Sequence, residues 1–200
     1  MKKRLMTLGV VTAAAVVPVA LAAPAPQGPK GPTIEELVED LRGRDLQGAE
    51  LVTAAIRVVA GTYRHTSVRH LWESPEASLR NRRGWSHQYN MVLARVLEGL
   101  GFETRLVHTP WLQGWEHPWW HNGHTWVKVR IDGRWWDACA SRASHRAGDL
   151  PAVPAADELP YHRRTNIALT LWMVPFVTYQ VWKGWLTGDP LPEWIYAPRR

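Results

Sequence analysis

Residues 83–106, RGWSHQYNMVLARVLEGLGFETRL, and residues 124–137, HTWVKVRIDGRWWD, decide the fold of this chain. In the first stretch, apolar side chains recur at helical spacing from Ser86 to Leu100, and Gly101 then ends the helix. In the second stretch, two alternating segments flank Asp132-Gly133, the strongest short signal for a β-hairpin. Together they predict a helix followed by an antiparallel hairpin.

Two more helices and one more strand are predicted around this unit. Thr33 and Glu36 have the spacing of a capping box, which begins a helix that runs to about Leu41. Another helix is expected near residues 49–60, and residues 104–108 alternate as a strand. Helices that precede an antiparallel sheet predict an α+β domain, with the helix from Ser86 packed on the sheet.

This arrangement resembles the core of the transglutaminase-like superfamily over about residues 81–140. The resemblance implies a papain-like fold whose triad is Cys, His and Asp. It assigns Ser86 to the position of the nucleophilic cysteine and His124 to that of the histidine. The family's aspartate lies four residues after the tryptophan that follows the hairpin turn, and counting from Trp135 gives Cys139. No cofactor is predicted.

The identity of the third residue depends on the hairpin register. A two-residue turn would put His124, Asp137 and Cys139 on one face, with Cys139 diagonal to His124 and Asp137 one pair further away. One extra residue in the turn would shift the pairing by one residue, so that Asp137 and Cys139 would no longer share a face with His124. We predict Asp137 as the third residue, with Cys139 as the alternative. Asp137 could approach His124 if the strand has a bulge or if the Asp137 side chain reaches back along the sheet. Cys139 is otherwise a small, buried apolar residue.

Serine at position 86 changes the chemistry that the resemblance implies. A thiol has a pKa of about 8.5 that its surroundings can lower, whereas a serine hydroxyl stays protonated and needs a general base during attack. An active chain would be an acyl transferase or an amide hydrolase. Because two of the three triad positions depart from the pattern, we favour a degenerate relative. Ser86 is expected to be the helix N-cap in either case.

The substrate cleft is predicted beside Ser86. Trp85 and Gln88 flank the nucleophile position. Trp115, Trp119 and Trp120 belong to a Trp-rich loop before His124, which would overhang the cleft. These indoles could form a wall for a peptide or a platform for sugars, or they could shield the hairpin from water.

A metal site is the rival use of this loop. His117, His121 and His124 are imidazoles that could bind zinc or copper. Their spacing does not match a common closed site, and only Glu116 lies near enough in sequence to complete it. We predict no metal, and we keep a His-rich metal-binding envelope protein as an alternative.

The chain divides into four parts. Residues 1–22 have the form of a secretory signal, with three basic residues, an uncharged run and a small-residue cleavage site near Ala22. We expect cleavage rather than an uncleaved anchor, then a Pro/Gly/Ala-rich linker over 23–32, the transglutaminase-like domain over 33–147 and a C-terminal extension over 148–200. Residues 167–182 are uncharged but short for a span, so we favour extra strands or a packing arm over membrane contact.

Composition limits the partners. The single cysteine rules out an internal disulfide, and the net charge of +6 is spread along the chain without a nucleic-acid-binding pattern. We predict a secreted or periplasmic envelope protein that acts on or binds peptide or protein amides. The alternative is a non-catalytic envelope module that binds a peptide or a glycan in a Trp-rich cleft.

Overall fold

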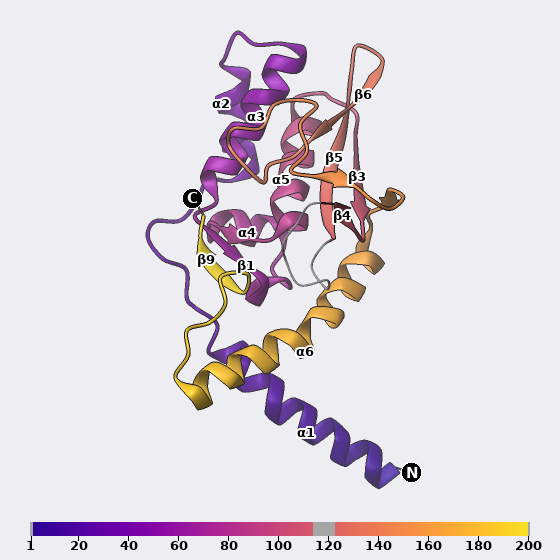
Figure 1. The fold of residues 1–200 in the computed structure, drawn as a ribbon. Coiled ribbons are helices and arrows are strands. Elements are labelled where there is room, and N and C mark those ends of the chain that lie inside the picture. Colours follow the sequence, from indigo (N-terminus) through magenta and orange to yellow (C-terminus); the bar gives the residue numbers. More distant parts are fainter. Residues whose placement is uncertain (1, 114–122, 200) are drawn as a thin grey trace.

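A four-stranded antiparallel sheet lies along one side of the domain, against a layer of helices (Figure 1). The computed structural model describes residues 2–113 and 123–199. The strand order is β6-β5-β3-β8, where the strands are β3 (Thr104–Thr109), β5 (His124–Ile131), β6 (Arg134–Ala138) and β8 (Leu159–Pro160). The predicted α+β class is confirmed.

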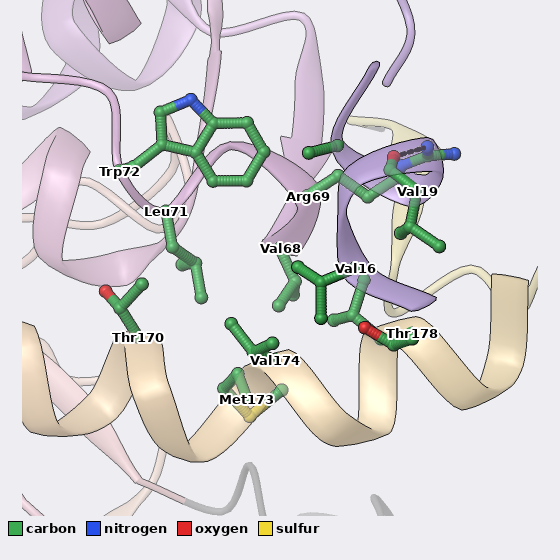
Figure 2. Close-up of a pocket in the computed structure, with 12 residues that line it drawn as sticks. Val16, Val19, Val68, Arg69, Leu71, Trp72, Thr170, Met173, Val174 and Thr178 are labelled. Carbon is green, nitrogen blue, oxygen red and sulfur yellow. Dashed lines mark hydrogen bonds between the residues drawn. The ribbon is translucent and has the colours of Figure 1, made fainter. Parts of the chain in front are cut away.

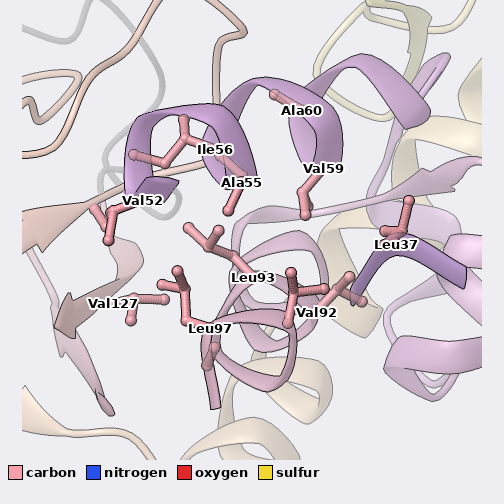
Figure 3. Packing of buried hydrophobic residues seen from close by; sticks show 14 of the residues in the cluster. Leu37, Val52, Ala55, Ile56, Val59, Ala60, Val92, Leu93, Leu97 and Val127 are labelled. Atoms are coloured by element: carbon pink, nitrogen blue, oxygen red, sulfur yellow. The ribbon is translucent and has the colours of Figure 1, made fainter. Parts of the chain in front are cut away.

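Three helices form the layer against this sheet. They are α2 (Ile34–Arg42), α3 (Gly48–Thr62) and α5 (Ser86–Gly99). α5 packs directly on β5 and β3, while α2 and α3 pack on α5. Leu93 and Leu97 of α5 are fully buried with Val127 of β5 in an aliphatic core (Figure 3). The three helices agree with the sequence prediction, including the capping box of Thr33 and Glu36.

The β5–β6 hairpin has the two-residue turn. Asp132 and Gly133 have φ values of 49° and 80°, the left-handed conformation that fits the twist of a tight hairpin. The ladder pairs Ile131 with Arg134 and Lys128 with Asp137, as the short turn requires. This register fixes which side chains share a face with His124.

Several short elements lead into α5 and were not predicted. β1 pairs with β2 on one side and with β9 on the other, in a small three-stranded sheet. The elements of this region are β1 (His65–Ser67), the 3-10 helix η1 (Val68–His70), α4 (Pro75–Arg80), β2 (Arg83–Gly84) and β9 (Tyr196–Pro198). A separate two-stranded ladder joins β4 (Leu112–Gln113) to β7 (Val153–Pro154). They are too short for a periodic pattern to reveal them.

The C-terminal extension contributes both a strand and a long helix. β8 adds an edge strand to the main sheet, and α6 (Arg163–Thr187) spans the uncharged residues. Of the two forms expected for residues 167–182, extra strands or a packing arm, the strands are absent, and these residues instead belong to a helix that packs on the domain. Met173, Val177 and Val181 recur every four residues and pack on Val68 in a second apolar cluster, which favours a helix. Within the residues that the structure describes, no helix is long and apolar enough to cross a membrane.

The segment predicted as a signal is a helix, α1 (Lys2–Leu21), which lies against α6 (Figure 1). Its last turns contact the domain through Val19, whose carbonyl oxygen accepts from Arg69 Nη2 at 2.6 Å. Trp182 Nε1 donates to the carbonyl oxygen of Ala15 at 2.9 Å. Figure 2 shows Val16 and Val19 facing Val68 and α6 across an apolar cavity. Cleavage near Ala22 stays a prediction.

The central position of α5 gives a stability prediction. Leu93→Ala should lower the free energy of unfolding by about 2–5 kcal/mol, because it removes a fully buried side chain between α5 and its neighbours. Urea unfolding followed by circular dichroism measures the change. Leu186→Ala on α6 is the matched control, since Leu186 is 80% exposed and its loss should change stability by less than about 0.5 kcal/mol. Equal effects would contradict this description of the core.

Candidate active site

The start of α5 is held by a glycine and a glutamine. A Cβ at Gly84 would lie 2.6 Å from Ser78 Oγ and 3.0 Å from Gln88 Oε1, so only glycine fits there. Gln88 Oε1 accepts from the backbone N–H of Trp85 at 2.9 Å. Trp85 is therefore the N-cap residue and Ser86 the first residue of the helix. The prediction that Ser86 is the N-cap is wrong by one position.

Gln88 has a full set of contacts in the protein. Its Nε2 donates to the carbonyl oxygens of His70 at 2.8 Å and Glu73 at 3.0 Å, and its side chain is completely buried. Together with the bond from Trp85, these contacts fix the chain before α5 to the first turn of the helix. Gln88 thus positions Ser86 and Trp85, both of which line a cavity.

His124 faces Cys139 across the hairpin. His124 Nε2 lies 3.1 Å from Cys139 Sγ, and both residues are buried. The thiol also lies 3.2 Å from Ser141 Oγ and 3.7 Å from Asn90 Nδ2. Of the two candidates for the third position, Cys139 is the one that contacts the imidazole.

Both members of this pair are uncharged at neutral pH. Burial lowers the pKa of His124 to about 3, with smaller contributions from His108 and His145. Burial also raises the pKa of the Cys139 thiol, against hydrogen bonds from Ser141 and Asn90 that lower it. A neutral imidazole beside a neutral thiol cannot provide the ion pair of a cysteine enzyme.

The carboxylate of Asp137 lies on the same face but is hydrogen-bonded to residues other than His124. Its Oδ1 accepts from Trp126 Nε1 at 2.8 Å and from Lys128 Nζ at 2.9 Å. Lys128 also pairs with Glu158 at 2.9 Å, which ties the hairpin to the segment before β8. The hairpin register thus places the carboxylate one pair beyond the position diagonal to His124.

Asn90 is a site residue that the sequence reasoning missed. Its Nδ2 donates to the carbonyl oxygen of Thr125 at 2.6 Å, and its Oδ1 accepts from the backbone N–H of Ala140 at 2.9 Å. It therefore fastens α5 to both hairpin strands, one residue from His124 and one from Cys139. The available signal was its place four residues after Ser86, a polar residue on the same helix face as the nucleophile position.

A small cavity of about 40 Å³ lies beside Ser86. A Cβ at Gly123 would lie 3.1 Å from His108 Cε1, so the chain passes close to the ring as it enters β5. The lining residues of this cavity are Leu71, Trp85, Ser86, His87, His108, Gly123, Thr125, Leu169, Thr170 and Met173. The last three belong to α6, which therefore forms one wall of the cavity.

One side chain that lines this cavity, His87, has unused hydrogen-bonding capacity: its Nε2 is buried without a hydrogen-bond partner among the described residues. The ring of Tyr161, which does not line the cavity, stacks on that of His87. Burial lowers the pKa of His87 to about 4, opposed by a hydrogen bond to the backbone of Leu71. A neutral ring that uses one nitrogen at Leu71 can accept a hydrogen bond at the other.

Part of the predicted substrate cleft lies outside the residues that the structure describes. Trp115, Trp119 and Trp120 lie outside the described residues, as do His117 and His121 of the rival metal site. The described part of the chain contains no group of three His, Cys, Asp or Glu side chains that could hold a metal.

Comparison with protein families identifies the superfamily of this chain. A family model described as the transglutaminase-like superfamily matches residues 35–139, from α2 to Cys139. The comparison with curated proteins gave no match. Among solved structures, the crystal structure of a TGase is 16% identical with a TM-score of 0.44, covering 54% of this chain and 30% of that one. A candidate cysteine protease from Cytophaga hutchinsonii is 14% identical with a TM-score of 0.47, covering 64% of this chain. This chain spans 42% of the length of the protease.

The buried neutral histidines predict acid destabilisation. Between pH 6.5 and the lowered pKa values of His87 and His124, the unfolded chain binds protons that the folded chain excludes. The free energy of unfolding should therefore fall as the pH falls below 6.5, by up to about 1.4 kcal/mol per pH unit for each histidine. Urea unfolding at pH 7.5, 6.0 and 5.0 measures this slope.

The variant His87→Phe tests whether His87 contributes to this pH dependence of the free energy of unfolding. It retains an aromatic ring against Tyr161 and removes one of the titrating groups, so its stability should depend less steeply on pH than that of the parent chain. Parallel pH profiles for the two proteins would contradict the assignment to His87.

Proposed function

Because the chain belongs to the transglutaminase-like superfamily, we propose that it is an exported member that binds peptide or protein amides at the cell envelope and has lost acyl-transfer catalysis. The observation that carries this proposal is the contact of 3.1 Å between His124 Nε2 and the Cys139 thiol, at the position where the family's aspartate is expected.

The lost catalysis follows from the charge balance of the site. A serine nucleophile needs a base that can become an imidazolium, and in a triad the carboxylate stabilises that cation. At Cys139 a buried thiol with a raised pKa takes the place of the carboxylate. Removing the triad carboxylate from a serine enzyme costs roughly 10⁴-fold in kcat. A proton moving from Ser86 to His124 would leave a buried cation beside a neutral thiol, which is unfavourable.

Binding rests on the polar groups of the cavity beside Ser86. The acceptor nitrogen of His87 suits the N–H of an amide, and the Thr125 hydroxyl and the first turn of α5 suit its carbonyl oxygen. A cavity of about 40 Å³ admits one such group and not a whole side chain. The rest of a peptide would lie at the mouth of the cavity, against the half-buried indole of Trp85.

Export is supported by the first 22 residues. Basic residues, an uncharged run and Ala20-Leu21-Ala22 form the three regions of a secretory signal. A chain with one cysteine, fully buried, needs no disulfide in an oxidising compartment.

Restoring the family's residues tests the loss of catalysis. The double variant Ser86→Cys/Cys139→Asp should react with iodoacetamide at pH 6.5 at least tenfold faster than Ser86→Cys alone, because a carboxylate at 139 can stabilise an imidazolium and thereby a thiolate. Mass spectrometry follows the modification at position 86. The parent chain should not react with an alkyl fluorophosphonate at any pH from 5 to 9. Labelling of the parent chain that disappears in Ser86→Ala would refute the proposal.

A separate measurement tests binding. Fluorescence polarisation with a fluorescein-labelled casein digest should give saturable binding to the parent chain and at least fivefold weaker binding to His87→Phe. Trp136→Ala on β6 is the matched control, because Trp136 is exposed outside the cavity. If His87→Phe has the melting temperature of the parent chain and binds the peptides equally well, the cavity is not the binding site.

A further inference from the structure

The outer face of α6 is an apolar surface on a helix whose inner face is already buried. Met173, Val177 and Val181 face the second apolar cluster. The opposite side carries large apolar side chains with exposed fractions of about one half or more: Ile167, Leu171, Trp172, Tyr179 and Leu186. Surface helices of soluble domains normally present polar residues on the outer side. The exposed apolar side of α6 therefore has the composition of an interaction surface.

The exposed residues form a stripe along the helix. Ile167, Leu171, Pro175 and Tyr179 follow one another at intervals of four, and Leu186 continues the stripe two turns later. At 1.5 Å per residue, the stripe from Ile167 to Leu186 is about 28 Å long. The inner face is packed on the domain over the same turns, so a partner meets the side of the helix rather than its end.

Charge indicates what the partner is. Arg163 and Arg164 begin α6, Lys183 lies near its end, and all three are exposed. The sequence has no Asp or Glu between Glu158 and Asp189. This stripe therefore offers positive charge at both ends and no negative charge along it. A second copy of the chain would bring like charges together, whereas an anionic surface is complementary.

The aromatic residues indicate the same partner. Trp172 and Tyr179 lie on the exposed stripe, and Trp185 is 45% exposed beside it. Tryptophan and tyrosine are favoured where an apolar layer meets water, because each ring has an apolar body and one polar group. Apolar side chains, interfacial aromatics and basic ends together are the features of a helix that lies in the plane of a membrane surface.

We infer that the outer face of α6 docks in the plane of an anionic lipid bilayer, with Leu171, Trp172 and Tyr179 inserted and the basic residues at lipid headgroups. The opposite face of α6 remains packed on the domain. The inference rests on the surface of α6 and is independent of the peptide-binding and catalytic parts of the proposed function.

A local probe tests this inference on the full chain. Tyr179→Cys, labelled with an environment-sensitive dye, should shift its emission to the blue when vesicles of equal phosphatidylglycerol and phosphatidylcholine are added. The native thiol of Cys139 is buried and stays unlabelled in the folded protein. Trp136→Cys, labelled in the same way on β6, is the control and should not shift. The probe at position 179 reports contact of α6 itself, and the probe at position 136 reports contact of the sheet.

Charge dependence completes the experiment. Changing Arg163, Arg164 and Lys183 to Gln should weaken vesicle binding by roughly fivefold for each charge removed, measured by sedimentation at low ionic strength. Phosphatidylcholine vesicles alone should bind at least tenfold more weakly than mixed vesicles. No shift at position 179, equal binding to both vesicle types, or a lipid-free dimer that Tyr179→Glu dissociates would each overturn the inference.

Discussion

The attachment of α5 to the β5–β6 hairpin is the constraint on which the rest of the structure depends. Packing of Leu93 and Leu97 against the sheet supplies the apolar part of this attachment. Asn90 supplies the directional part, because its amide bonds the backbone of Thr125 on one strand and of Ala140 just beyond the other. The amide of a buried Asn is costly to leave unpaired. These bonds therefore fix the position of α5 along the sheet as well as its distance from the sheet. His124 and Cys139 are held in contact beside Asn90 as a result, and Ser86 begins the same helix four residues earlier.

The same attachment explains why the buried pair of His124 and Cys139 is stable in its uncharged form. An imidazole with a pKa of about 3 and a thiol with a raised pKa both adopt the neutral form that burial favours. A buried carboxylate beside His124 would need compensation from nearby donors or cations. The only hairpin carboxylate that shares this face, Asp137, has its donors further along, in Trp126 and Lys128. Burial and a charged triad thus make opposite demands on the residue beside His124, and the Cys139 thiol meets the demand of burial.

The predictable part of the fold is the part with periodic patterns. Three predicted features are present in the structure: the capping box at Thr33, the apolar stripe of α5 that ends before Gly101, and the Asp132-Gly133 turn. Each depends only on residues that are close together in the sequence. The sequence left two turn lengths open; the structure has the two-residue turn, and with this register Cys139 lies diagonal to His124 as predicted for that turn. The role of Asn90 could not be predicted, because it depends on which strands meet the helix. The N-cap is Trp85 rather than Ser86 because Gln88, three residues later, accepts from the backbone N–H of Trp85. The bonds from Gln88 to His70 and Glu73, which hold this amide in place, are long-range and could not be predicted from local sequence. For α6, the uncharged run favoured extra strands or a packing arm over a membrane segment, and the structure shows a helix that packs on Val68 and Leu71.

The burial of Cys139 has a consequence for how the protein ages. Its thiol is inaccessible and its pKa is raised, so oxidants that require a thiolate at the surface cannot reach it while α5 and the hairpin stay together. Oxidation or cross-linking to another chain must wait for a local opening that separates Asn90 from the strands. Oxidation during such an opening would leave a larger, more polar group at position 139, which fits the buried site less well. The extent of oxidation at Cys139 in a stored sample would therefore report the openings in which its thiol met an oxidant.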